Sequence, residues 1–216
     1  MKKYITLFNI IFVTATFAQN VGSSAAINVN NIYLPFNNKG VIADVNIPPG
    51  GSMGQFAGNA FLFSSGFWVS GYTDDSLWAN AVATSTLVED YQPGISGMDP
   101  NDPLASIYKL NINDVPFGQS WQDWIDAVEL GADFYDGDGD GVYNPVDLNN
   151  NNQWDPDEDK PDLLLDETYW CVYNDGVPAN QRRWHSEPQG IEIRQTIFAN
   201  TSAIATGNTI FIKYRL

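Results

Sequence analysis

This sequence of 216 residues contains one cysteine and few basic residues. Its single cysteine, Cys171, cannot form an internal disulfide, and one histidine with one cysteine is too few for a zinc site. Ten lysines and arginines stand against 26 aspartates and glutamates, so the formal charge is −16. Nucleic acid and anionic membrane surfaces repel such a chain, because they are negative themselves. The composition therefore excludes nucleic acid as a partner and favours metal cations.

The first residues have the pattern of an export signal. Two lysines precede an almost wholly apolar run over residues 4–13, and Ala18 is the small residue before a cleavage site at Gln19. The run is shorter than the roughly 20 residues that a transmembrane helix needs, which favours a signal peptide over residues 1–18 and not a membrane anchor. We therefore expect an exported protein, secreted or at the cell surface, whose mature chain has no membrane span.

Most apolar segments are short, aromatic or β-branched, and bounded by Gly, Pro, Asn or Asp, which is the signature of strands. The strands expected from this pattern cover residues 27–34, 41–47, 60–72, 107–112, 168–173, 191–198 and 209–216. They predict a mainly β domain over residues 19–216, an antiparallel β-sandwich with one short helix and an acidic insertion at 133–167. Cys171 lies in an apolar strand and is expected to be buried. Because the last strand still alternates at Leu216, we expect the chain to continue beyond it.

One helix is expected between Ser120 and Gly131. Ser120 is the expected N-cap, with Asp123 three residues later, and Gly131 supplies the stop. Apolar residues recur at helical spacing inside this stretch, namely Trp121, Trp124, Ile125 and Val128. This spacing places the tryptophans on a core face in preference to a sugar-stacking platform.

Acidic residues crowd into one region of the chain. Sixteen of the 26 lie between Asp123 and Asp175, where Lys160 is the only base. Within it, residues 136–147 match the twelve-residue calcium loop of an EF-hand, with a glycine at position 6 where the loop turns sharply. The expected oxygen ligands are Asp136, Asp138, Asp140, the carbonyl of Val142, Asn144 and Asp147. Calcium takes about six to eight oxygens, and alternate carboxylates on a tight loop supply three of them.

A second register of the same motif begins where the first one ends. Its expected ligands are Asp147, Asn149, Asn151, Gln153, Asp155 and Glu158. Asn152 replaces the glycine of position 6, and Asn is the residue other than Gly that best tolerates a left-handed turn. Asp147 would then bridge two ions. The second loop has fewer charges, so we expect one calcium site, with a second weaker one left open.

A solvated acidic turn is the alternative, because Asp and Asn also favour turns. Neither loop is expected to act as a sensor, since Pro145, Pro156 and Pro161 disfavour the helix that would leave an EF-hand loop. With their shared closing residue, the loops resemble the tandem aspartate-rich loops of thrombospondin type 3 repeats. That resemblance implies a structural calcium clamp.

Five segments of the chain together resemble the amino-terminal region of large exported proteins of the type IX secretion class, which carry a C-terminal sorting domain. They are residues 65–71 (SGFWVSG), 136–145 (DGDGDGVYNP), 166–175 (DETYWCVYND), 190–199 (GIEIRQTIFA) and 208–215 (NTIFIKYR). The resemblance covers residues 60–216. It implies a modular protein that is surface-attached or released, with the sorting domain downstream, and it implies no chemistry for any named residue.

No arrangement of residues predicts an enzyme. The chain lacks a nucleophile-elbow motif, and nothing in the sequence pairs two free carboxylates as a glycosidase requires. We expect a non-catalytic module with a structural or adhesive role. The alternatives are a calcium-dependent carbohydrate-binding module, with Trp68, Trp154 and Trp184 as stacking rings, or an accessory domain of a secreted hydrolase. Glycans and other surface proteins are the candidate partners.

Overall fold

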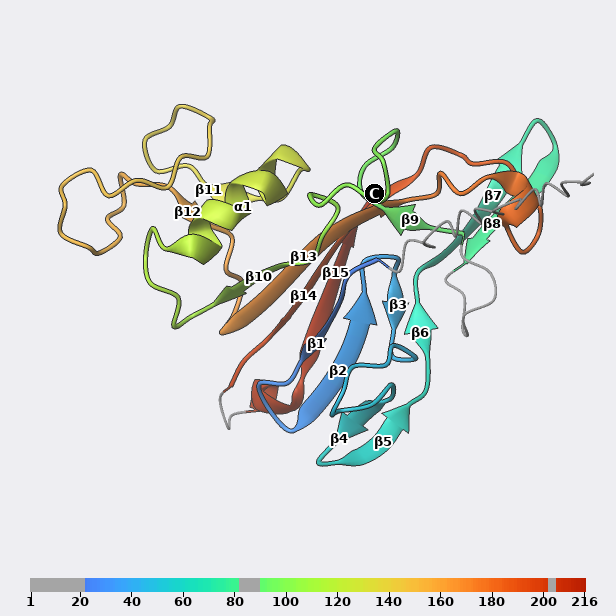
Figure 1. Cartoon of the computed structure of the whole chain (residues 1–216), viewed down its shortest axis with the longest axis horizontal. Helices are drawn as coiled ribbons and strands as arrows, with labels where there is room; N and C mark the ends of the chain where they lie inside the picture. The colour runs from blue at the N-terminus through green and yellow to red at the C-terminus, as the bar shows by residue number, and fades with distance from the viewer. Residues whose placement is uncertain (1–21, 82–89, 202–204) are drawn as a thin grey trace, which may run out of the picture.

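The structure is a computed structural model, and it describes residues 22–81, 90–201 and 205–216 (Figure 1). The expected signal peptide over residues 1–18 lies outside them. The elements, in chain order, are β1 (Ser24–Ile27), β2 (Ile32–Asn37), β3 (Val41–Ile42), β4 (Gly54–Phe56), β5 (Asn59–Leu62), β6 (Ser65–Gly66), β7 (Trp68–Thr73), β8 (Ser76–Ala81), β9 (Gln92–Pro93), β10 (Tyr108–Asn111), α1 (Gln119–Glu129), β11 (Phe134–Tyr135), β12 (Lys160–Pro161), β13 (Glu167–Asn174), η1 (Ala179–Gln181), β14 (Glu192–Ala199), η2 (Ala205–Asn208) and β15 (Ile210–Arg215). No helix within the described ranges has the length and apolarity of a membrane span.

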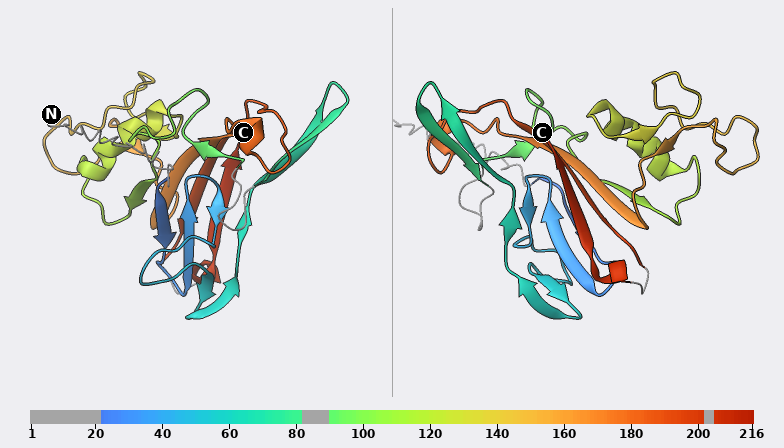
Figure 2. Two further views of the ribbon diagram at one scale, coloured as in Figure 1. Left: turned by 45° about the vertical axis from the view of Figure 1, so that its right-hand side comes forward. Right: turned by 180° about the vertical axis from the view of Figure 1, so that it is seen from behind.

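Two antiparallel sheets form the body of the molecule. The first has the order β5-β4-β2-β3-β6, with β1 paired to β2, and the second has the order β10-β13-β14-β15, with β9 paired to β13. Two smaller pairs stand apart from them: β7 with β8, a hairpin that projects from the body, and β11 with β12, beside α1 (Figures 1 and 2). The predicted fold class, mainly β with antiparallel sheets and one short helix, is confirmed.

The long strand β13 lies at the centre of the fold, and all eight of its residues are buried. Trp170 and Val172 contact a cluster that includes Trp124 and Ala127 of α1, on one face of the sheet. The alternate residues face the first sheet, in clusters with β1, β2, β3 and β14; they are Tyr169, Cys171 and Tyr173. Strand side chains alternate between faces, so β13 is covered on both sides; residues 169–173 in its middle are aromatic or apolar, whereas the buried Glu167, Thr168 and Asn174 near its ends are polar. The prediction that Cys171 is buried is confirmed, because it is 1% exposed.

The helix α1 is present where it was expected, but its first residues differ from the prediction. The N-cap is Gly118, which offers no side-chain cap, and Ser120 lies inside the first turn. A turn closed by the Gly118 amide on the carbonyl of Val115 starts the helix earlier than the capping pattern suggested. The stop at Gly131 is confirmed, since its φ of 98° is accessible mainly to glycine. Trp124 is 1% exposed, which confirms the core face.

Three of the predicted strands have different limits. The segment 27–34 includes the end of β1, a turn and the start of β2, and within it the Asn30 side chain accepts a hydrogen bond from the Ile32 amide at 2.8 Å. The segment 41–47 leaves β3 after Ile42, and 60–72 is divided into β5, β6 and β7. The turn within 27–34 coincides with turn-forming residues, Asn28, Asn30 and Asn31, which the predicted strand had included.

The pair β11–β12 positions the acidic segment. Phe134 pairs with Pro161 and Tyr135 with Lys160, so residues 136–159 leave the stem and return to it as two successive loops. These loops project from the molecule beside α1 (Figure 1). Phe134 lies with its ring centroid 5.2 Å from that of Tyr143, a buried member of the α1 cluster. The loops are thus joined to the core at their base.

Candidate metal centre

An aromatic clamp holds the stem of the acidic loops. The Lys160 ammonium lies 3.8 Å from the centroid of the Trp154 ring and 5.4 Å from that of Tyr135. Trp154 Nε1 donates a hydrogen bond to the carbonyl of Glu158 at 2.9 Å, and the Tyr135 hydroxyl donates one to the carbonyl of Pro156 at 3.0 Å. The only base of the region therefore faces two rings. Among the described residues, no base forms an ion pair with a carboxylate of residues 136–159.

The first loop gathers three carboxylates. Oxygens of Asp136, Asp138 and Asp159 all lie within 4.8 Å of one another, and this group can hold a metal ion. Asp136 accepts hydrogen bonds from the amides of Gly139 at 2.8 Å and Gly141 at 3.0 Å, which winds the loop around its side chain. Both glycines have positive φ, 77° and 78°, and so allow the chain to curl this tightly. The group is made of oxygen donors on a preformed turn.

Asp159 closes this loop from the far side of the segment. It is 3% exposed, and its two oxygens accept hydrogen bonds from the amides of Gly137 at 2.9 Å and Asn144 at 2.7 Å. A Cβ on Gly137 would overlap the backbone of Glu158, so glycine is required where the loop passes the returning chain. The buried carboxylate is thereby held at the metal group by two backbone donors.

This closing residue differs from the sequence expectation, in which Asp147 closed the first loop and bridged two ions. Asp147 instead begins the second loop, where its carboxylate accepts hydrogen bonds from the amides of Asn151 at 3.2 Å and Asn152 at 2.7 Å. The physical reason is the β11–β12 pair, which returns Asp159 to the start of the loop. Sequence reasoning missed Asp159 because it lies 23 residues after Asp136, outside the span of a twelve-residue motif. In the sequence, Asp159 is marked only by its position between Glu158 and Lys160.

The remaining expected ligands of the first loop lie near the group without joining it. Asp140 accepts a hydrogen bond from the Val142 amide at 2.7 Å, and the side chains of Asp140, Val142 and Asn144 are all exposed. Asn144 contributes its backbone amide to Asp159. The structure therefore brings together Asp136 and Asp138 of the expected set and adds Asp159.

The second loop follows the same path with different side chains. Asn150 and Asn152 have φ of 60° and 59°, at the positions of Gly139 and Gly141. Glu158 is 2% exposed and accepts hydrogen bonds from the amides of Leu148 at 2.7 Å and Asp155 at 2.9 Å. These two amides stand where Gly137 and Asn144 stand in the first loop. Glu158, the last expected ligand of the second register, therefore closes the second loop through these two hydrogen bonds.

Side-chain amides of the second loop donate hydrogen bonds to one of its carboxylates. The Nδ2 groups of Asn149 and Asn151 donate hydrogen bonds to the same Asp155 oxygen, at 2.7 Å and 2.9 Å. The Asn151 side chain also accepts a hydrogen bond from the amide of Gln153 at 2.6 Å. The loop is therefore satisfied by its own side chains, and its carboxylates form no group of three among the described residues.

Crowding of like charges distinguishes the first loop. The hydrogen bond from the Asp140 amide lowers the pKa of Asp138, but desolvation and the carboxylates of Asp140, Asp159 and Asp136 together raise it above its ordinary value. Carboxylates without a counter-ion resist ionisation in this way, and a bound cation relieves the repulsion. The direction of the pKa shift therefore reflects the crowding of carboxylates in the first loop.

The three tryptophans of the carbohydrate-binding alternative have different surroundings. Trp68 is 59% exposed and Trp184 is 47% exposed, and their rings meet edge to face, with centroids 6.3 Å apart and planes at 68°. Trp154 is partly buried beneath Lys160. The rings of Trp68 and Trp184 are thus open to solvent without being coplanar, and Trp154 belongs to the stem of the acidic loops.

Comparisons with known proteins found no matching family model, no matching curated protein and no matching solved structure.

Proposed function

We propose that this protein is an exported, non-catalytic module that calcium stabilises by binding in its acidic loops. The observation that carries the proposal is the group of Asp136, Asp138 and the buried Asp159, whose oxygens lie within 4.8 Å of one another without a basic partner among the described residues. Calcium is a hard cation that prefers carboxylate and carbonyl oxygens, and the first loop offers only oxygen donors.

The position of the group favours a clamp and not a switch. The first loop is anchored through Tyr143 to the core at one end and through the β11–β12 pair at the other. A cation bound between Asp136 and Asp159 would join the start of the segment to its end. It would thereby hold both loops against α1, in a chain that has no disulfide to do so.

Export and surface attachment rest on the sequence of residues 1–18 and on the resemblance to type IX secretion proteins. The acidic loops suit that destination, because extracellular calcium modules bind with a Kd of roughly 10⁻⁴ to 10⁻³ M, a range that only extracellular calcium fills. Amino-terminal sequencing of the exported protein should begin at Gln19, and a mature protein that retains Met1 would contradict this part of the proposal.

Thermal melts test the calcium clamp directly. The unfolding of the wild-type chain is followed by circular dichroism with calcium, with magnesium and with chelator. Calcium should raise Tm, whereas magnesium should substitute poorly, because it demands a tighter octahedral shell and releases its waters reluctantly. A melt that is the same in calcium and in chelator would show that the loops are ordinary acidic turns. A panel of glycosidic, ester and peptide substrates should show no turnover.

Glycan binding is the second candidate function, with the chain as a carbohydrate-binding module or the accessory domain of a hydrolase. The exposure of Trp68 and Trp184 favours it, because exposed indoles stack on sugar rings. Titration with soluble oligosaccharides, read by tryptophan fluorescence, tests this candidate. Binding that is lost in Trp68→Ala and kept in Trp121→Phe would establish it, and no change in fluorescence with any sugar would eliminate it.

A further inference from the structure

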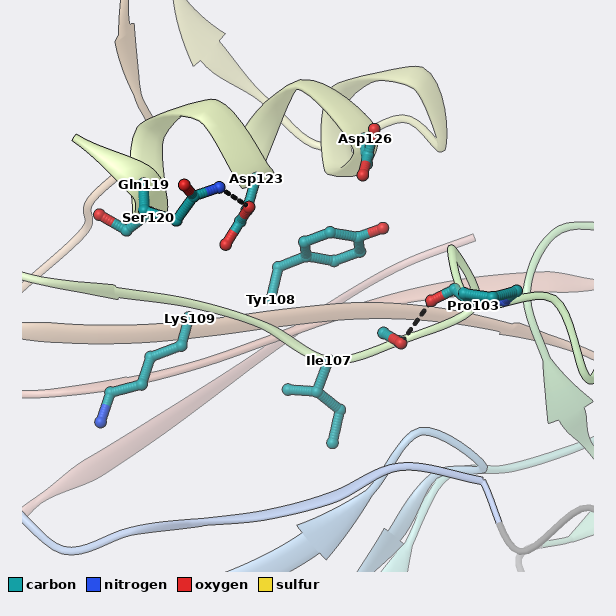
Figure 3. A pocket seen from close by; sticks show the side chains of 9 residues that line it. Pro103, Ile107, Tyr108, Lys109, Gln119, Ser120, Asp123 and Asp126 are labelled. Atoms are coloured by element: carbon teal, nitrogen blue, oxygen red, sulfur yellow. Dashed lines mark hydrogen bonds between the residues drawn. The ribbon is translucent and has the colours of Figure 1, made fainter. Parts of the chain in front are cut away.

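A cavity of about 480 Å³ lies between α1 and the segment that leads into β10 (Figure 3). Its upper wall is one face of the helix, with Gln119, Ser120, Asp123 and Asp126. Its floor is the ring of Tyr108 together with the apolar side chains of Ile107 and Pro103. The volume is within the roughly 300–1,000 Å³ that small-molecule sites occupy. The cavity is separate from the acidic loops.

Two carboxylates of the helix converge on the Tyr108 ring. Asp123 and Asp126 are three residues apart, so they lie on neighbouring turns of one helix face, and both project toward Tyr108 in Figure 3. Asp123 accepts a hydrogen bond from Gln119 Nε2 at 2.7 Å, which orients its carboxylate along the wall. Within the described part of the chain, neither carboxylate forms an ion pair. The cavity therefore has two negative charges over an aromatic and aliphatic floor.

The one basic side chain at the cavity is committed elsewhere. The Lys109 ammonium pairs with Glu167 and lies 5.1 Å from the centroid of the Tyr169 ring, on the side away from the helix. Figure 3 shows Lys109 extended away from Asp123 and Asp126. It leaves their charge uncompensated.

The negative charge of the cavity also affects the Tyr108 hydroxyl. Burial raises the pKa of the Tyr108 hydroxyl, and the carboxylates of Asp126, Asp123, Asp102 and Glu129 raise it further, in that order. Four negative groups thus act at one point of the cavity. Clefts walled by charges of one sign concentrate ligands of the opposite sign.

We propose that this cavity binds a small organic cation, an alkyl chain bearing ammonium groups that lies along Tyr108 and Ile107 and is held by Asp123 and Asp126. An organic cation fits better than a metal ion, because the cavity is many times larger than an ion and its floor is apolar. Methylene groups pack on the ring and on Ile107, and ammonium groups contact the carboxylates and the face of the aromatic ring. Two carboxylates on neighbouring turns match a ligand with two ammonium groups.

Calorimetric titration of the chain with butane-1,4-diamine tests the proposal, in buffer with saturating calcium so that the carboxylates of the first acidic loop are occupied and do not compete for the diamine. The diamine should bind, and its neutral counterpart butane-1,4-diol should not. Affinity should fall as the ionic strength is raised to about 0.15 M, because screening weakens the attraction between charges. The absence of diamine binding at low ionic strength, or equal binding of the diol, would overturn the proposal.

Isosteric variants locate the site. Asp123→Asn/Asp126→Asn should raise the Kd of the diamine by about tenfold or more, because both charge partners are lost. Glu187→Gln removes one exposed charge far along the chain and should leave the Kd within about twofold, since exposed charges at long range are screened. The single Asp126→Asn change should give an intermediate Kd, and circular dichroism checks that each variant is folded. If the double variant binds as tightly as Glu187→Gln, the diamine binds outside this cavity and the proposal fails.

Discussion

The two acidic loops follow nearly the same backbone path with different side chains. Both use a leading aspartate that accepts hydrogen bonds from amides further along the loop, Asp136 in the first and Asp147 in the second. Both have two residues of positive φ, and both are closed by a buried carboxylate. The first loop uses carboxylates and glycines where the second uses asparagines. Hydrogen-bond acceptors alone are therefore enough to wind such a loop, and only the first loop also gathers three carboxylates that could hold a metal ion.

The closing residues offer the largest test of this comparison. Asp159→Ala and Glu158→Ala each remove the charged acceptor of two partly buried backbone amides, so each should lower the free energy of unfolding in chelator by about 3 kcal/mol. Only Asp159→Ala should also abolish the response to calcium. Urea unfolding of both variants, with and without calcium, measures the two effects. Loss of the calcium response in Glu158→Ala, and not in Asp159→Ala, would contradict the assignment of the ion to the first loop.

Calcium itself should have the next largest effect, and its size counts the sites. At a tenfold excess of free ion over Kd, one site adds about 1.4 kcal/mol to the free energy of unfolding, and two independent sites add about 3 kcal/mol. The side-chain amides of Asn149 and Asn151 already donate hydrogen bonds to Asp155 in the second loop, which favours one site and a stabilisation of about 1.4 kcal/mol. Urea unfolding at a series of calcium concentrations distinguishes the two. A stabilisation that follows the two-site curve would show that the asparagine loop binds calcium as well.

The residues of positive φ should respond unequally to substitution. Gly141→Ala places a Cβ at a φ of 78° and should cost about 1–2 kcal/mol, because alanine has no means to offset the left-handed conformation. Asn152→Gly, at a φ of 59°, should change stability by a few tenths of a kcal/mol, roughly the balance between relieved strain and lost order in the unfolded chain. Thermal unfolding in chelator measures both. Equal costs at the two positions would show that the loops differ in backbone as well as in charge.

Substitution of a single expected ligand should have the smallest effect on Tm in chelator. The variants of the two loops should differ from each other only when calcium is present. Asp138→Ala removes a member of the carboxylate group and should eliminate most of the calcium-dependent rise in Tm. Asn151→Ala removes an uncharged group of the second loop and should leave most of that rise. Melts of both variants in calcium and in chelator provide the measurement. A calcium response that survives Asp138→Ala unchanged would place the ion elsewhere.

Much of the fold was predictable because its strands are short, apolar and bounded by turn residues. Where prediction differed, the cause was local structure that composition does not carry. The turn at Asn30 divides a segment that was predicted as one strand, and the turn before Gly118 starts α1 ahead of the serine that fits the capping pattern. The buried position of Trp124 followed from helical spacing alone.

The sequence by itself predicted a group of carboxylates that could hold a metal ion in the segment after Asp136, because alternating carboxylates and glycines match a calcium loop. It also determined that Cys171 is a buried strand residue, because the cysteine lies within the short aromatic and apolar run of residues 169–173. Only the tertiary structure decided which carboxylate closes the first loop. The antiparallel pairing of Tyr135 with Lys160 returns Asp159 to Asp136, and burial with two amide donors holds it there. Tertiary packing also decided that Asp123 and Asp126 line the same cavity as Tyr108, because these residues come together only when α1 packs on β10.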